Sequence, residues 1–143
     1  MAQASASIQI AASADEVWQL IGGFDSLPDW LPYIPKSETA EGGRVRYLAN
    51  PNGEAIVERL EKFDHAARSY SYSIIRAPFP ITGYLATISV QPPAGGSGCR
   101  VNWSGTFTPR GVSDSEASKM FQGIFEDGLK ALAARFAPDR AVQ

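Results

Sequence analysis

The amino-acid sequence predicts an α+β fold in which a curved antiparallel sheet carries one long C-terminal helix. Residues 44–109 read as strand after strand, with turn residues between the strands and no helical period. Residues 113–136 then read as a single amphipathic helix. One helix cannot fill the space over a large, strongly curved sheet, so this combination also predicts a pocket between the two.

The composition limits the classes of protein to which this chain can belong. Its 143 residues suffice for one domain, expected to span residues 1–143, and the formal net charge of −2 offers no basic surface for nucleic acid. The one cysteine, Cys99, excludes an internal disulfide and suits a reducing compartment. The N-terminus lacks the features of a signal peptide, and no apolar run reaches the roughly 20 residues of a membrane span. We therefore expect a cytoplasmic protein without a membrane-spanning segment.

The N-terminal segment is expected to supply one strand and two short helices. Residues 4–10 alternate between apolar and polar side chains, which is typical of a half-buried strand. Ser13 and Glu16 have the spacing of a capping box, which predicts a helix that ends at Gly22 and Gly23. Residues 24–31 predict a second short helix.

Six further strands follow, each separated from the next by turn residues. With the strand at residues 4–10 they predict a seven-stranded sheet, in the order β-α-α-β-β-β-β-β-β-α along the chain. The six predicted strands span residues 34–39, 44–49, 54–63, 68–76, 83–91 and 98–108.

The last helix begins at a second capping box, formed by Ser113 and Glu116. At 3.6 residues per turn, its apolar face carries Ala117, Met120, Phe121, Ile124, Phe125, Gly128 and Leu132. A glycine within a helix costs about 1 kcal/mol relative to alanine, yet Gly128 lies near the centre of this face. Two interpretations stay open: Gly128 allows close packing on a strand, or it leaves room for a ligand.

The connections between the strands predict where the pocket opens. In an antiparallel meander, alternate connections lie at the same end of the sheet, which brings the loops at residues 50–53 and 77–82 together. The second loop places apolar residues where water is expected, and such residues usually cover something. We therefore expect the entrance at Asn52, Phe79 and Pro80. The alternative is that the second loop tucks into the domain's own core.

Strand alternation predicts which side chains line the pocket. Tyr47, Tyr72, Tyr84 and Trp103 fall on inward-facing stripes of four different strands. A buried phenol needs a hydrogen-bond partner, and a plain core would favour phenylalanine or leucine. The tyrosines therefore indicate polar groups inside an aromatic pocket, unless their hydroxyls reach backbone or water at its rim.

Residues 54–63 allow two registers. If Ile56 and Leu60 face inward, Glu58 enters the pocket between them, whereas the opposite register places Arg59 inside. Burial would raise the pKa of a carboxyl group there, so Glu58 would serve as a general acid or base, or as a polar anchor. The alternative is an exposed strand face of alternating charges.

Few residues elsewhere in the sequence support catalysis. His65 is the only histidine, and its turn lies at the end of the sheet opposite the expected entrance, out of reach of a nucleophile in the pocket. One histidine and one cysteine do not make a zinc site. We therefore expect no metal site and no cofactor, and we interpret His65 as a residue of a surface turn.

The chain carries a series of short motifs along nearly its whole length. They are Ala14-Asp15-Glu16-Val17-Trp18, Phe24-Asp25 with Leu27 and Trp30, Glu58-Arg59-Leu60-Glu61, Trp103-Ser104-Gly105 and Phe107-x-Pro109. Together these motifs resemble the polyketide cyclase/dehydrase-like proteins of the START-like superfamily. The resemblance implies the helix-grip fold of the birch pollen allergen, in which a seven-stranded antiparallel sheet wraps around a long C-terminal helix. It implies little about activity, because relatives include lipid carriers, aromatase/cyclases and hormone receptors.

Residues 58–84 are also similar to the plant abscisic-acid receptors. That similarity implies that Glu58 and Tyr84 face the pocket and that the loops at residues 50–53 and 79–81 form its entrance. It also turns three residues of the last helix inward: Met120, Ile124 and Gly128. Phe79 and Pro80 replace the receptors' latch histidine and arginine, and the receptors' ligand-binding lysine falls near Pro35 or Lys36. Hormone binding of that kind is therefore not expected.

Three hypotheses for the function follow. The first is binding or carriage of a small apolar, ring-containing or lipid-like ligand between the sheet and the last helix. Its pocket would be lined by Tyr47, Glu58, Tyr72, Tyr84, Trp103, Met120, Ile124 and Gly128. The second is a polyketide cyclase or dehydratase that uses Glu58 as acid or base, with Tyr72 or Tyr84 polarising a carbonyl. The third is a protein-interaction module that uses the Phe79 loop or the outer face of the sheet.

Overall fold

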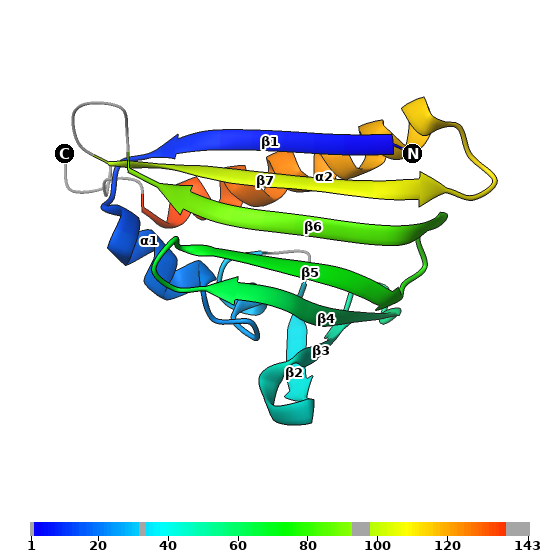
Figure 1. The fold of residues 1–143 in the computed structure, drawn as a ribbon, viewed down its shortest axis with the longest axis horizontal. Coiled ribbons are helices and arrows are strands. Elements are labelled where there is room, and N and C mark those ends of the chain that lie inside the picture. The colour runs from blue at the N-terminus through cyan, green and yellow to red at the C-terminus, as the bar shows by residue number, and fades with distance from the viewer. Residues whose placement is uncertain (1, 32–33, 93–97, 137–143) are drawn as a thin grey trace.

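A computed structural model describes residues 2–31, 34–92 and 98–136 of the chain. Within these residues, seven antiparallel strands form one open sheet in the order β1-β7-β6-β5-β4-β3-β2, and the helices lie against one face of it (Figure 1). The arrangement confirms the predicted α+β class and the predicted number of strands. In the described ranges no helix is long and apolar enough to span a membrane.

Each predicted strand overlaps an observed one. The strands are β1 (Ala2–Ile10), β2 (Lys36–Ala40), β3 (Val45–Ala49), β4 (Ala55–Asp64), β5 (Ser69–Arg76), β6 (Ile81–Gln91) and β7 (Cys99–Pro109). The helices are α1 (Ala14–Ile21) and α2 (Asp114–Arg135), with short 3-10 turns η1 (Leu27–Asp29) and η2 (Glu41–Gly43).

Both α-helices begin at the predicted capping boxes. In α1 the Ser13 hydroxyl accepts from the backbone N–H of Glu16 at 3.2 Å, while the Glu16 carboxylate accepts from the backbone N–H of Ser13 at 3.4 Å. The same reciprocal pair joins Ser113 and Glu116 at 3.0 and 3.3 Å. These bonds satisfy backbone donors that have no partner within the helix, so the sequence itself fixes where each helix starts.

The second predicted helix is wrong in extent, because only η1 forms within residues 24–31. The Ser26 hydroxyl lies 2.7 Å from the carbonyl oxygens of both Leu20 and Gly23, which closes a turn after α1. The carbonyl of Phe24 accepts a hydrogen bond from Nη1 of Arg46 at 2.9 Å. Pro28 has no N–H to donate to this carbonyl in a continued helix, so the side chain of Arg46 supplies the donor instead.

The long helix α2 packs mainly against β1 and β7, at one side of the sheet (Figure 1). The residues beneath it are small, among them Ala4 and Ala6 of β1 and Gly105 of β7. A Cβ at Gly105 would lie 3.2 Å from the Cβ of Ala86 and 3.5 Å from the Phe125 ring, so a larger residue would push the helix away. Because the helix lies close to this side, other segments must cover the rest of the same face.

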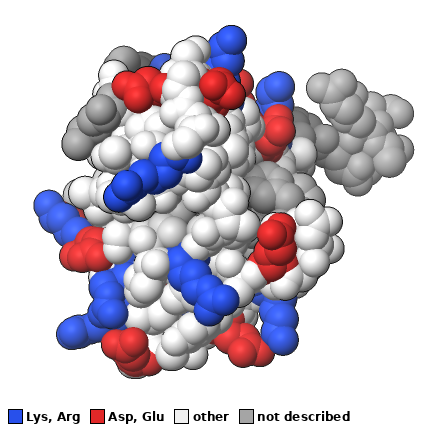
Figure 2. Space-filling model, turned by 90° about the vertical axis from the view of Figure 1, so that its right-hand side faces the viewer, with Lys and Arg blue, Asp and Glu red and all other residues white. Residues whose placement is uncertain are grey.

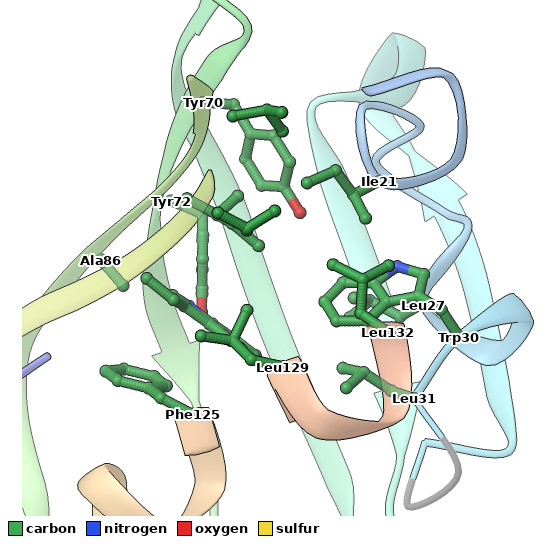
Figure 3. Close-up of a cluster of buried hydrophobic side chains, with 14 of the residues drawn as sticks. Ile21, Leu27, Trp30, Leu31, Tyr70, Tyr72, Ala86, Phe125, Leu129 and Leu132 are labelled. Carbon is green, nitrogen blue, oxygen red and sulfur yellow. The ribbon is translucent and has the colours of Figure 1, made fainter. Parts of the chain in front are cut away.

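The N-terminal segment supplies that cover. Figure 3 shows side chains of α2 meeting those of the sheet on one side and those of residues 21–31 on the other. The labelled residues are Phe125, Leu129 and Leu132 of α2, Tyr70, Tyr72 and Ala86 of the sheet, and Ile21, Leu27, Trp30 and Leu31 of the N-terminal segment.

Helix α1 closes the end of the sheet opposite the predicted entrance. Trp18 donates from Nε1 to Nδ1 of His65 in the β4–β5 turn at 2.9 Å. Arg68 of the same turn forms an ion pair with Asp15 at 2.7 Å. A β-bulge at Glu61 turns the end of β4, so that Phe63 packs against the Trp18 ring, with the ring centroids 5.5 Å apart. His65 is exposed, as predicted, and anchors α1.

The capping box of α2 gives a direct test of helix initiation. Ser113→Ala removes the hydroxyl that accepts from Glu116, and should lower the free energy of unfolding by about 1 kcal/mol. Ser115→Ala, two residues further on at an exposed position of the same helix, should have almost no effect. Urea unfolding followed by circular dichroism measures both, and equal effects of the two variants would contradict the role of the cap.

Candidate functional site

A cavity of about 200 Å³ lies between the sheet and α2. Its wall is built by β3 to β7, by η1 and the residues that follow it, and by α2. Most of the wall is apolar, with Leu31, Ile34, Leu48, Ile56, Phe121 and Phe125 among its residues. Five polar side chains interrupt it: Arg46, Asn50, Glu58, Tyr72 and Tyr84.

A larger groove, of about 530 Å³, lies at the edge of the sheet between β1 and α2. It is open and largely polar, and Gln122, Glu126 and Lys130 of α2 form one side of it. Gln122 accepts a hydrogen bond from the backbone N–H of Ser5 at 3.1 Å, and so satisfies part of the free edge of β1. The groove therefore reflects how the edge strand is covered, and the internal cavity is the better candidate for a binding site.

The two loops that were predicted to form the entrance both border the cavity. Asn50 and Pro51 of the β3–β4 turn and Phe79 of the β5–β6 loop form part of its wall. The Phe79 ring also packs edge-on against Phe121 of α2 at 5.3 Å, so the loop tucks into the core and lines the cavity at once. Figure 2, which faces this end of the molecule, shows acidic and basic side chains interspersed, with no patch of one sign.

Arg46 and Glu58 form a buried ion pair in the cavity wall. Nε and Nη2 of Arg46 each lie 2.7 Å from Oε1 of Glu58, and the two residues are 1 % and 7 % exposed. They are directly opposite one another on β3 and β4. Burial raises the pKa of Glu58 above its ordinary value, while the positive charge of Arg46 acts against that rise.

Aromatic rings and a carbonyl hold the rest of the Arg46 guanidinium. Its carbon lies 4.1 Å from the centre of the Phe24 ring and 4.8 Å from that of Tyr72. Nη1 donates to the carbonyl of Phe24 at 2.9 Å and to the hydroxyl of Tyr70 at 3.4 Å. Burial alone would lower the pKa of Arg46, but the charge of Glu58 raises it above its ordinary value. Arg46 therefore stays protonated and ties the segment after α1 to the sheet.

A second polar group in the wall is a chain of three side chains. Nε1 of Trp103 donates to the hydroxyl of Tyr72 at 3.1 Å, and the hydroxyls of Tyr72 and Tyr84 lie 3.1 Å apart. Both tyrosines are buried. Burial raises the pKa of Tyr84 well above its ordinary value, and burial likewise raises that of Tyr72. Both phenols are therefore neutral hydrogen-bonding groups throughout the physiological range.

The structure brings together five of the eight residues predicted to line the pocket. Glu58, Tyr72, Tyr84, Trp103 and Ile124 lie in the cavity wall. Among the entrance residues, Phe79 does so too, whereas the turn contributes Asn50 and Pro51 where Asn52 was expected. Pro80 lies outside the wall.

Three predicted lining residues lie elsewhere. Met120 is partly buried and packs against the core, and Gly128 is buried on α2, but neither belongs to the cavity wall. Tyr47 is 47 % exposed, on the opposite face of the sheet. The prediction for Tyr47 is wrong because β3 presents Arg46 and Leu48 to the cavity, and a charged residue was not expected to face inward.

Arg46 is the residue that sequence reasoning missed. The signal that could have found it is the β3–β4 hairpin, whose turn at Asn50 to Gly53 predicts the pairing of the two strands. In the structure the loop has five residues, Asn50 to Glu54, so Ala49 pairs with Ala55 and Arg46 lies directly opposite Glu58, and residues that face each other across an antiparallel pair share one face. An inward Glu58 therefore implies an inward Arg46.

The profile of the family described as "Polyketide cyclase / dehydrase and lipid transport" matches residues 1–137. The chain belongs to this family. Among solved structures, the protein XoxI from Bacillus cereus is 58% identical and has a TM-score of 0.92, with 95% of this chain and 96% of that chain covered. Comparison with the curated proteins gives no match.

Solved structures with much lower sequence identity share the fold. A START superfamily protein from Mycobacterium smegmatis has a TM-score of 0.76 at 18% identity, with 94% of this chain and 96% of that chain covered. The Zhui aromatase/cyclase from Streptomyces sp. R1128 has a TM-score of 0.76 at 19% identity, with 99% and 95% covered. These likenesses confirm the START-like, helix-grip architecture implied by the sequence motifs.

The ion pair of this cyclase/dehydrase-family chain predicts a strong dependence of stability on Glu58. Glu58→Gln leaves Arg46 buried without its counter-charge, and should lower the free energy of unfolding by about 3–5 kcal/mol. The double variant Arg46→Met/Glu58→Leu removes both charges and should recover most of that loss. Urea unfolding of the variants measures the differences.

The matched control is Glu38→Gln, because Glu38 forms an exposed ion pair with Lys36 at 3.4 Å. It should change the free energy of unfolding by less than about 1 kcal/mol. A loss at Glu58 no larger than the loss at Glu38 would show that the buried pair does not hold the fold together.

The two buried tyrosines predict how stability depends on alkaline pH. Their pKa values are raised in the folded chain, whereas tyrosines of the unfolded chain ionise near pH 10. The unfolded state therefore loses protons that the folded state keeps, and stability falls as the pH rises above about 10, by about 1 kcal/mol per pH unit for each group. Tyr72→Phe/Tyr84→Phe should make this decline shallower in urea unfolding between pH 8 and 11. An unchanged slope would contradict the burial of the two hydroxyls.

Proposed function

We propose that this protein binds a small, apolar, ring-containing molecule in the cavity between the sheet and α2. The observation that supports this proposal is the composition of the cavity wall, which is predominantly apolar and aromatic and includes a few convergent polar side chains. This combination is typical of sites that enclose small organic ligands, because apolar surface supplies affinity and a few polar groups fix orientation. Membership of a family whose description includes both cyclases and lipid transport agrees with such a role.

The volume of the cavity supports a ring over a lipid chain. An engineered protein cavity of about 150 Å³ holds one benzene molecule, and the cavity here measures about 200 Å³. Pockets for larger ligands usually have about 300–1,000 Å³. The cavity therefore suits one substituted ring or two fused rings, and it is too small for a long acyl chain in this conformation.

A cyclase- or dehydratase-type reaction is the second candidate. The observation that favours it is Glu58, a carboxyl group in the cavity wall whose pKa is raised by burial. Against it stands Arg46, which makes two contacts of 2.7 Å to one oxygen of that carboxylate and so commits it to an ion pair. If a substrate is found, an unchanged turnover rate in folded Glu58→Gln protein would eliminate Glu58 as the acid or base.

Blocking the cavity tests the proposed binding. Ile56 lies in the cavity wall, so Ile56→Phe should fill the space that a ring would occupy and abolish binding of fluorobenzene. The same substitution at Ile75, which is 52 % exposed, should leave binding unchanged. Fluorine NMR titration of fluorobenzene measures both, with circular dichroism to show that the variants are folded. Absence of binding to the unmodified protein, or equal binding to both variants, would rule out the proposal.

A further inference from the structure

The chain of Trp103, Tyr72 and Tyr84 has one hydrogen-bond donor more than it uses. The three side chains carry one indole N–H and two hydroxyl protons. Within the described residues they make two hydrogen bonds, one from Trp103 to Tyr72 and one between the two hydroxyls. Whichever tyrosine donates in the second bond, one hydroxyl proton has no acceptor, and both hydroxyls belong to side chains of the cavity wall.

The two charged side chains of the cavity wall offer no free charge to a ligand. Arg46 and Glu58 neutralise each other at 2.7 Å, and the guanidinium is also held by the Phe24 carbonyl and the Tyr70 hydroxyl. A charged ligand would therefore have to give up its hydration without a free counter-charge in the wall, at a cost of several kcal/mol. The cavity favours a ligand without net charge.

We infer that the cavity selects neutral one-ring aromatic molecules that carry a hydrogen-bond-accepting oxygen, such as a ketone, held by the spare hydroxyl proton of the Tyr72–Tyr84 pair. This inference rests on the proposed function and names the class of ligand for the same site. A purely apolar ligand would leave a buried hydroxyl proton unpaired, which is unfavourable. A ligand oxygen at that point completes the chain from Trp103, so binding sites of this kind discriminate against analogues that lack the acceptor.

Two probe molecules of nearly equal shape distinguish the contribution of the acceptor oxygen to affinity from that of the ring. Acetophenone carries a carbonyl oxygen where α-methylstyrene carries a methylene group. We expect both to bind the unmodified protein, because both have the ring. The ratio of their affinities should fall about fivefold in Trp103→Phe/Tyr72→Phe/Tyr84→Phe in favour of α-methylstyrene, the effect of losing one neutral hydrogen bond. Trp103 is replaced as well, because its indole N–H would otherwise lose its acceptor and donate to the ligand in place of the hydroxyl. Ligand-observed NMR titration gives both dissociation constants.

The matched control is Tyr47→Phe, which removes a hydroxyl from an exposed tyrosine on the other face of the sheet. It should leave the affinity ratio unchanged. A second measurement needs no variant: in the infrared difference spectrum, the carbonyl stretching frequency of acetophenone bound to the unmodified protein should be lower than in hexane. That shift keeps the inference testable if the triple variant fails to fold.

The outcomes distinguish this inference from the function on which it rests. If neither probe binds the unmodified protein, the proposed function fails and this inference fails with it. If both bind and Ile56→Phe blocks both, the proposed function stands. In that case an unchanged affinity ratio in the folded triple variant, or a carbonyl frequency equal to that in hexane, overturns only the inferred selection for an acceptor oxygen.

Discussion

The fold must bring Arg46 and Glu58 together, because either charge alone would be buried without a counter-charge. The pair joins neighbouring strands, and the remaining donors of Arg46 reach the carbonyl of Phe24, which belongs to the segment after α1. One guanidinium thus connects β3, β4 and the N-terminal segment, in which Phe24 precedes Arg46 by 22 residues. Two buried charges are tolerated only when each is neutralised and hydrogen-bonded, so these three parts of the molecule must assemble together.

The same contact explains why a cavity exists and where it lies. Small residues of β1 and β7, such as Ala4 and Gly105, let α2 lie close to one side of the sheet, away from β3 and β4. The segment that follows α1 covers the other side, and its position is set by the bond from Arg46 to Phe24. Between a helix held at one side and a segment held at the other remains a space of about 200 Å³.

Local patterns predicted most of the fold and about half of the site. The capping boxes at Ser13 and Ser113 and the strands follow from short-range chemistry. The helix expected over residues 24–31 does not form, because Pro28 has no N–H to donate to the Phe24 carbonyl, and that carbonyl accepts from Arg46 instead, a contact between distant parts of the chain. The prediction that Tyr47 faces the pocket is wrong for a related reason. Hydrophobic alternation assigns Arg46 to solvent, because it cannot foresee the buried counter-charge of Glu58.

The polar groups of the cavity wall are of two kinds: those whose charges and hydrogen bonds stabilise the fold, and those that keep an unused hydrogen-bond donor. Arg46 and Glu58 neutralise each other, and Arg46 also donates a hydrogen bond to the N-terminal segment, so their main effect is on folding. Tyr72 and Tyr84 also stabilise the core, through Trp103 and through each other, but they retain one proton that the described residues do not use. A ligand can accept the hydrogen bond that this proton does not make within the protein, and such a bond is stronger in the protein interior than in water. The tyrosine pair is therefore where specificity enters this site, and the ion pair is what keeps the site in place.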